Sequence, residues 1–505
     1  MHRLLVGAGL AFVVLSSPVG TGQTPSSARV VSFQNSGAPA AQMPFLRGLA
    51  LLHDFEYERA AAEFQKAETA DPRFAMAYWG EAMTHNHPVW MEQDLAAARA
   101  ALARLGPTPQ VRAGNAGTER ERAYLAAVET LYGEGTKADR DVRYEAAMAG
   151  LQAKYPDDVD AAAFHALAIL GTSHAGRDFA TYMRAAAILE SLFSEHRQHP
   201  GVLHYLIHCY DDPVHAPLGL RAARLYGVVA PDAGHALHMT THIFLALGMW
   251  DDVSRVNRQA IAVVNAQRAA AGQGEVFCGH YPSWLVYSDL QQRNVDEARR
   301  YIDGCRRTAL AELQGRVPES ADPDDSRTGS FLAVRQMLTA ETGEWKAADD
   351  VPLDRASAWE RFANAYGSLL GANARGDRGA LAMAEVTLRR LAPELLKKLD
   401  ASGDPSLARR AAINATRLQA EALVKLRGGD TSGGIASLRR AAALEADAPI
   451  EFGPPMVAKP SFELLGDELL RLKRSAEAAA AYSTQLTRTP GRTLTLQGVA
   501  KARPQ

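Results

Sequence analysis

The chain has 505 residues, 47% of them hydrophobic, so a continuous core can form, and 55 basic against 57 acidic residues give a net charge of -2. This near-neutral balance argues against nucleic acid and against an anionic membrane surface as partners. Many Ala, Leu, Arg and Glu residues favour helix, and no stretch alternates apolar and polar residues as a strand does.

The N-terminus has the pattern of a signal peptide. A short basic start (His2, Arg3) precedes an apolar run over residues 4–15, and small residues follow it. A run of about 12 apolar residues is too short to span a bilayer. We expect residues 1–22 to be removed and the mature chain to be periplasmic or secreted, without stable membrane insertion; the alternative is an uncleaved anchor. Residues 23–40, rich in Ser, Gly, Pro and Ala, are expected to form a flexible leader.

The chain contains three cysteines, Cys209, Cys278 and Cys305. At most one disulfide can form within the chain, so stability must come from packing. Cys278 lies two residues before His280 and is the one cysteine considered as a metal ligand, whereas Cys209 is expected to be buried.

One spacing occurs near both ends of the chain: a small residue, a second small residue, an aromatic residue and a proline, 12, 4 and 8 positions apart. The two copies are Gly48, Ala60, Phe64, Pro72 and Gly466, Ala478, Tyr482, Pro490. Small residues let two helices approach, the aromatic ring fills the gap to the next repeat, and proline stops the second helix. The pattern resembles the tetratricopeptide repeat of 34 residues.

A second repeated signal marks the turn within a helix pair. Its copies are Phe55–Ala60, Gly248–Val253 and Gly343–Ala348, with weaker copies at Arg293–Ala298 and Lys473–Ala478.

The resemblance implies an all-α solenoid of about ten helix–turn–helix repeats, whose first helices line a concave groove that binds protein or peptide. We expect an N-terminal array over residues 41–313, a polar linker over 314–327 and a C-terminal array over 328–500.

Histidines concentrate in one part of the chain. Seven of the 15 lie within residues 204–280, and the pair His204 and His208 recurs 34 residues later as His238 and His242. Two consecutive repeats thus carry the same i,i+4 pair in register. At about 100° per residue, the first pair is centred roughly 120° from the apolar stripe of its helix, so these histidines are expected to face the groove, outside the core.

Two such pairs on helices packed about 8–10 Å apart can share one metal ion. The site is expected to contain four histidines, with three further residues that either bind the ion or hold its ligands in place: His204, His208, His238 and His242, then His235, His280 and Asp211. Imidazole and carboxylate suit zinc, copper, nickel or ferrous iron, and protonation is expected to weaken binding below about pH 6. The alternatives are a groove that binds a peptide or an anionic ligand through these histidines, or a structural role.

No HExxH, GxSxG, P-loop, CxxC or glycine-rich dinucleotide turn occurs. Segments 204–213 and 235–244 are similar to a histidine-rich group of exported bacterial tetratricopeptide-repeat proteins, which implies protein binding and does not imply catalysis. Two hypotheses follow: an exported scaffold or binding protein whose histidine cluster binds a metal ion or ligand, and a metal-dependent enzyme or metal carrier that uses the same cluster.

Overall fold

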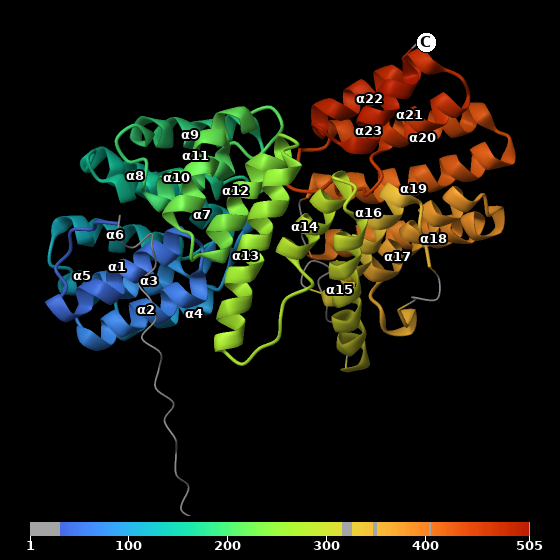
Figure 1. Cartoon of the computed structure of the whole chain (residues 1–505). Coiled ribbons are helices and arrows are strands. Elements are labelled where there is room, and N and C mark those ends of the chain that lie inside the picture. The colour runs from blue at the N-terminus through green and yellow to red at the C-terminus, as the bar shows by residue number, and fades with distance from the viewer. Residues whose placement is uncertain (1–30, 316–325, 347–350, 403–405, 504–505) are drawn as a thin grey trace, which may run out of the picture.

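The computed structural model describes residues 31–315, 326–346, 351–402 and 406–503, and this part of the chain is almost entirely helical (Figure 1). The first fifteen helices are α1 (Pro39–His53), α2 (Tyr57–Ala70), α3 (Ala75–Met83), α4 (Leu95–Leu105), α5 (Pro109–Asn115), α6 (Glu119–Leu131), α7 (Lys137–Lys154), α8 (Val159–Leu170), α9 (Phe179–Phe193), α10 (Pro200–Cys209), α11 (Ala216–Val229), α12 (Gly234–Ala246), α13 (Trp250–Ala270), α14 (His280–Gln291) and α15 (Val295–Gly315). The remaining eight are α16 (Arg327–Thr342), α17 (Ala358–Arg375), α18 (Arg378–Ser402), α19 (Leu407–Gly428), α20 (Thr431–Asp447), α21 (Ser461–Arg471), α22 (Ser475–Arg488) and α23 (Thr493–Ala502).

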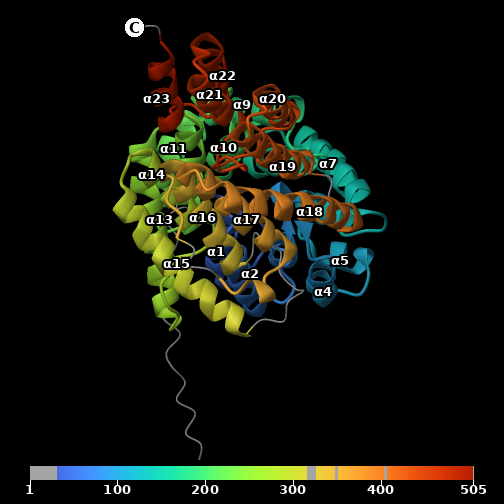
Figure 2. The ribbon, with the colours of Figure 1, turned by 90° about the vertical axis from the view of Figure 1, so that its right-hand side faces the viewer.

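The other elements are short. Strands β1 (Asn86–His87) and β2 (Glu92–Gln93) pair antiparallel around the 3-10 turn η2 (Pro88–Trp90), and a second such turn, η4 (Leu353–Arg355), precedes α17. Helices adjacent in sequence pack against one another along the chain, and Figure 2 shows α17, α18, α19 and α20 as successive neighbours. The predicted all-α, tetratricopeptide-like solenoid is confirmed.

The spacing of small and aromatic residues has the packing role that the repeat pattern predicts. Phe64 is fully buried, and a Cβ atom added to Gly48 would lie only 2.8 Å from its ring. Tyr482 is likewise fully buried, and a Cβ atom on Gly466 would lie 2.6 Å from it. In both repeats the glycine lets the aromatic ring of the second helix rest directly on the first helix.

Four of the predicted turns share one backbone geometry. Their first residues, Phe55, Gly248, Arg293 and Lys473, have positive φ angles of 55°, 70°, 64° and 60°. In each turn the next amide donates to the carbonyl five residues before it, at 2.8–2.9 Å, which ends the first helix of the pair. The chain therefore reverses in the same way even where the left-handed residue is not glycine.

The copy at Gly343–Ala348 differs from the prediction. Residues 343–346 are not helical, 347–350 lie outside the described part of the chain, and the next α-helix begins only at Ala358. Trp345 explains the departure, because its side chain fits where Gly367 and Gly371 leave space on α17.

The apolar core continues from the first array into the second. One cluster of buried residues joins Leu285 of α14 to Phe331 of α16 and thus spans the predicted linker. Residues 316–325 of that linker lie outside the described residues, and α15 continues to Gly315. The division between the arrays is therefore not a break in the packing.

Residues 31–38, part of the predicted flexible leader, are instead packed. Phe33 is buried, and its ring centre lies 5.4 Å from Phe45 and 5.3 Å from Tyr124, while Ser36 Oγ donates to Glu121 at 2.8 Å. The predicted signal segment, residues 1–22, lies outside the described residues. Among the described helices, none has the length and apolar character needed to cross a membrane.

Candidate metal centre

The two histidine pairs lie on α10 and α12, first helices of neighbouring repeats. Pro200 at the start of α10 favours a helical backbone, and His199 caps the helix, because its Nδ1 accepts the Val202 amide at 3.4 Å. Every residue of α10 is buried, and so is every residue of α12 except the partly exposed His235. The paired histidines therefore lie inside the protein.

The expectation that these histidines face an open groove is wrong. Aromatic rings from distant segments cover them: Phe55 lies 4.3 Å from His204, and Trp284 and Phe452 lie 4.3 and 5.3 Å from His242, measured between ring centres. The helical wheel describes one helix at a time. It cannot show that the turn after α1, helix α14 and the segment between α20 and α21 pack over these rings.

The first histidine set consists of His204, His208 and His235, and one nitrogen atom of each lies within 4.8 Å of the others. The Nε2 atoms of His204 and His208 are 3.1 Å apart. His204 Nδ1 donates to the His53 carbonyl at 2.6 Å, so the neutral ring has a lone pair on Nε2. His235 Nε2 is buried and has no hydrogen-bond partner among the described residues.

The second histidine set consists of His238, His242 and His280, again with one nitrogen atom of each within 4.8 Å of the others. The Nε2 atoms of His238 and His242 are 3.2 Å apart. On the far side of each ring, His242 Nδ1 lies 2.5 Å from Asp211 Oδ2, and His238 Nδ1 lies 2.8 Å from Asn257 Oδ1. His280 is the exposed member of the set.

The hydrogen-bond network determines where the protons of the second set lie. Thr241 Oγ1 donates to the His238 carbonyl at 2.6 Å, so it can only accept from Asn257 Nδ2, 3.4 Å away. This turns Asn257 Oδ1 toward His238 Nδ1, which must carry a proton. His242 Nδ1 carries one as well, because the Asp211 carboxylate only accepts. Two Nε2 lone pairs then face each other, an arrangement that a cation between them, either a proton or a metal ion, stabilises.

Burial favours the uncharged form of these rings. It lowers the pKa of His204, His208 and His238 well below the ordinary histidine value, and neighbouring imidazoles lower the pKa of each ring further. Neutral imidazole is the form that binds metal ions. A proton on His204, His208 or His238 is thus disfavoured at neutral pH.

The structure brings all seven predicted residues together but groups them differently. Each i,i+4 pair takes its third histidine from the start of the next first helix, so one expected site becomes two adjacent sets. The ring centres of His208 and His242 are 6.3 Å apart, where the sets adjoin. Asp211 supports His242 from the outer side of its ring. Whether a metal ion binds stays a prediction.

Residues outside the repeat pattern hold His53, whose carbonyl accepts the hydrogen bond of His204 in the first set. Buried His53 donates from Nε2 to Asp160 Oδ1 at 2.9 Å and accepts the Tyr205 hydroxyl on Nδ1 at 3.0 Å. Burial acts to raise the pKa of Asp160, but hydrogen bonds from His199 and His53 outweigh it and hold the pKa well below its usual range. Because His53 and Asp160 lie outside the 34-residue register, no spacing in the sequence connects them to His204.

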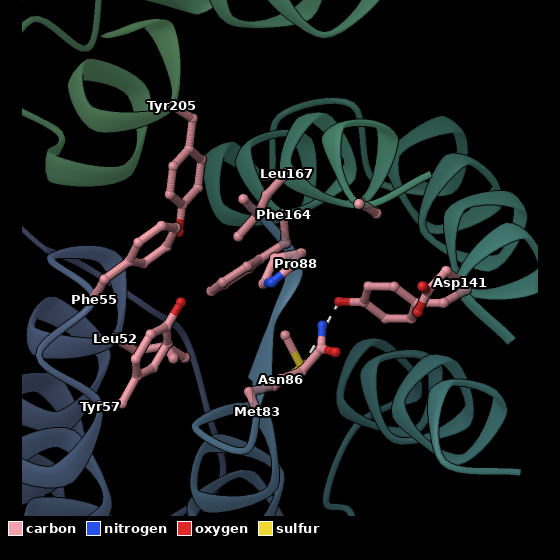
Figure 3. A pocket seen from close by; sticks show the side chains of 13 residues that line it. Leu52, Phe55, Tyr57, Met83, Asn86, Pro88, Asp141, Phe164, Leu167 and Tyr205 are labelled. Atoms are coloured by element: carbon pink, nitrogen blue, oxygen red, sulfur yellow. Dashed lines mark hydrogen bonds between the residues drawn. The ribbon is translucent and has the colours of Figure 1, made fainter. Parts of the chain in front are cut away.

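A small cavity lies beside the first set, between α1, α2, η2, α7 and α8. Figure 3 shows Phe55, Tyr57 and Tyr205 along one side of it and Asp141 on the other. Its volume of about 20 Å³ has room for one water molecule. The Tyr57 hydroxyl is buried and has no hydrogen-bond partner among the described residues, so a water molecule there would satisfy it.

Cys278 is not available as a thiolate ligand, because it forms a disulfide with Cys305. This corrects its consideration as a metal ligand. Cys209 is buried and free, as expected.

No sequence model of a protein family matches the chain, and no curated protein matches it in sequence. Among solved structures, the chain is similar to the Cut9–Hcn1 hetero-tetramer of the APC/C, with 12% identity over 94% of this chain and 78% of that chain and a TM-score of 0.34. It is also similar to the human IFIT1 dimer with m7Gppp-AAAA (12% identity, 95% of this chain, 93% of that chain, TM-score 0.35). A third similar structure is the P58(IPK) TPR domain, with 11% identity over 86% of this chain and 99% of that chain and a TM-score of 0.22. Likenesses this weak say nothing of what the chain binds or does.

Proposed function

We propose that this chain is an exported scaffold protein of the tetratricopeptide type that holds a transition-metal ion between His238, His242 and His280. One observation carries the proposal: the Nε2 atoms of His238 and His242 face each other 3.2 Å apart while both Nδ1 atoms serve as donors. Two nitrogen ligands of a tetrahedral zinc ion stand roughly 3.3 Å apart, given bonds of about 2.0–2.1 Å. The spacing of this pair therefore suits a shared ion.

The surroundings of the rings favour metal binding as well. Asp211 and Asn257 hold the Nδ1 atoms of His242 and His238, as outer partners of metal-bound imidazoles commonly do. Because the three donors are imidazoles, zinc, copper, nickel and ferrous iron suit the site, whereas magnesium and calcium prefer oxygen ligands.

A second candidate function is that of a metal-dependent enzyme or metal carrier. The three-histidine set favours it, because three protein ligands leave a fourth coordination position for water or substrate. Exposed His280 also gives the ion a route from solvent. Release of the ion to an acceptor protein would identify a carrier, and turnover of a substrate by the loaded chain would identify an enzyme.

Export is supported by the basic and apolar N-terminal sequence and by the disulfide between Cys278 and Cys305, since disulfides persist in oxidising compartments. A protein or peptide is the partner that the repeat resemblance implies. With the histidine side filled, the C-terminal array offers the place for it, where a cavity of about 230 Å³ lies among residues of α16, α17 and α19.

Metal analysis of the full chain tests the proposal. The protein is stripped with a chelator, reloaded with Zn(II) and desalted, and bound zinc is measured by mass spectrometry. The double variant His238→Ala with His242→Ala is compared with His196→Ala, a histidine outside both sets. We expect stoichiometric zinc in the parent and in the control and its loss from this site in the double variant, with helicity kept by circular dichroism. A parent chain that binds no transition metal, or a double variant with undiminished metal, overturns the proposal.

A further inference from the structure

We propose that the first histidine set, His204, His208 and His235, holds a second transition-metal ion, so that the chain contains a two-ion centre. The inference rests on the metal binding proposed for the second set and extends it to an adjacent site. It concerns residues that the sequence alone assigned to one shared ion.

The two sets are built in the same way. Each contains an i,i+4 pair at the fifth and ninth residues of one first helix, and the pairs are 34 residues apart. Each is completed by a histidine at the start of the following first helix, His235 as the second residue of α12 and His280 as the first residue of α14. The two sets therefore resemble each other in the helix positions of their three histidines.

The hydrogen bonds of the first set point to a ligand at its centre. The His53 carbonyl engages His204 Nδ1 and leaves the Nε2 lone pair 3.1 Å from His208 Nε2. A proton on His208 Nε2 could bridge this pair of nitrogens. It would not give a partner to His235 Nε2, which is buried and has no hydrogen-bond partner among the described residues. A metal ion accepts all three nitrogen lone pairs at once. The third, unpartnered nitrogen is therefore the observation that favours an ion over a proton.

The two ions would be neighbours. A bound ion lies roughly 3 Å from the centre of an imidazole ring, given a metal–nitrogen bond of about 2.0 Å. The His208 and His242 ring centres are 6.3 Å apart, so ions on these two rings are at most about 12 Å apart. Both sets also reach solvent through their third member, since His235 is partly exposed and His280 is exposed. Trp90, 41% exposed with its ring centre 6.0 Å from His235, stands beside the route to the first set.

Each ion would keep an open coordination position beside three imidazoles. Imidazole donors suit zinc, copper, nickel or ferrous iron over magnesium and calcium at both positions. The centre would take water or a small anion as its exchangeable ligands.

Stoichiometry with single substitutions tests the second ion. The full chain and the variants His235→Asn and His280→Asn are stripped and loaded separately with Zn(II) and with Cu(II), with His196→Asn as the control. Both substituted residues lie at the start of a helix and have exposure to solvent, so circular dichroism should show an unchanged fold. We expect two equivalents in the parent and the control and one tight equivalent in each single variant. The double variant His204→Gln with His208→Gln, which keeps hydrogen-bonding side chains, should also retain one equivalent of metal, bound at the second set.

The outcomes separate this inference from the proposed function. One equivalent in the parent, lost in His280→Asn and kept in His235→Asn, would overturn the second ion and leave the proposed function intact. One equivalent lost in both single variants would mean a single shared ion and would also overturn it. Two equivalents in all variants would place the metal elsewhere and overturn both proposals, as would no metal in the parent.

Discussion

Arg492 ties the last helices of the solenoid to its middle. It is completely buried just before α23, and its Nε donates to Glu463 of α21 at 2.7 Å. Its Nη2 lies 2.8 Å from Glu341 of α16, and its Nη1 donates to the Tyr287 hydroxyl of α14 at 3.2 Å. One guanidinium therefore joins α14, α16 and α21. We predict that Arg492→Met loosens α21–α23 from the rest of the protein.

The magnitude follows from what the substitution leaves behind. Glu463 keeps Lys459 Nζ at 2.8 Å, but Glu341 loses its closest cation. Removing one partner of a buried ion pair costs about 3–5 kcal/mol, because the other charge stays desolvated. Methionine fills much of the arginine volume and limits the cavity. At about 1.4 kcal/mol per factor of ten, the opened population of α21–α23 should rise roughly one-hundred-fold to several-thousand-fold.

Hydrogen–deuterium exchange with peptide resolution measures this opening directly, with α2–α4 as an internal reference. Arg439→Met is the matched control, because its pair with Glu477 is exposed and is expected to contribute at most about 1 kcal/mol. Adding Glu341→Gln to Arg492→Met removes the buried charge that has lost its partner. This double variant should recover part of the protection of α21–α23 against exchange. An increase of less than tenfold in α21–α23, or one no greater than in the control, would refute the reasoning.

Acid should loosen the same region: burial acts to raise the pKa of Glu463, but Arg492 and Lys459 outweigh it and hold the pKa below its usual range. A depressed folded pKa adds stability above the unfolded value of about 4.3 that is lost as pH falls below it. The opened population of α21–α23, obtained from exchange rates corrected for the intrinsic amide rate at each pH, should therefore increase below about pH 4.5. Zinc at about 100 times its dissociation constant should stabilise the stripped chain by roughly 2.7 kcal/mol per ion, seen as a rise in thermal unfolding temperature; no rise would count against specific binding. His208→Ala with His242→Ala should lower zinc content without loss of helicity by circular dichroism, since one ligand leaves each set. Because burial lowers the pKa of His204, His208 and His238, the parent should retain zinc to a pH below the 6 expected from sequence, as a pH series of metal analyses can show. Terminal sequencing of protein from the native host should begin near residue 23, and an intact Met1 on a cytoplasmic protein would contradict export.

Much of the fold was predictable because the repeat is a local property. The contact of Gly48 with Phe64 and the left-handed turn residues Phe55, Arg293 and Lys473 involve neighbours within one helix pair. Trp345 shows the limit: it resembles a turn residue in sequence but packs against α17. Residues 31–38 depart from the predicted leader for a similar reason, since Phe33 packs against Phe45 and the distant Tyr124.

The sequence by itself determined that four histidines occupy equivalent positions, because a 34-residue register and an i,i+4 spacing place His204, His208, His238 and His242 on equivalent faces of neighbouring first helices. Only the tertiary structure decided that these rings are buried, that they divide into two sets, and that Asp211, Asn257 and the His53 carbonyl orient them. The physical reason is that helix periodicity sets the direction of a side chain, whereas burial and hydrogen-bond partners depend on segments that are distant in the sequence and meet only in the folded chain.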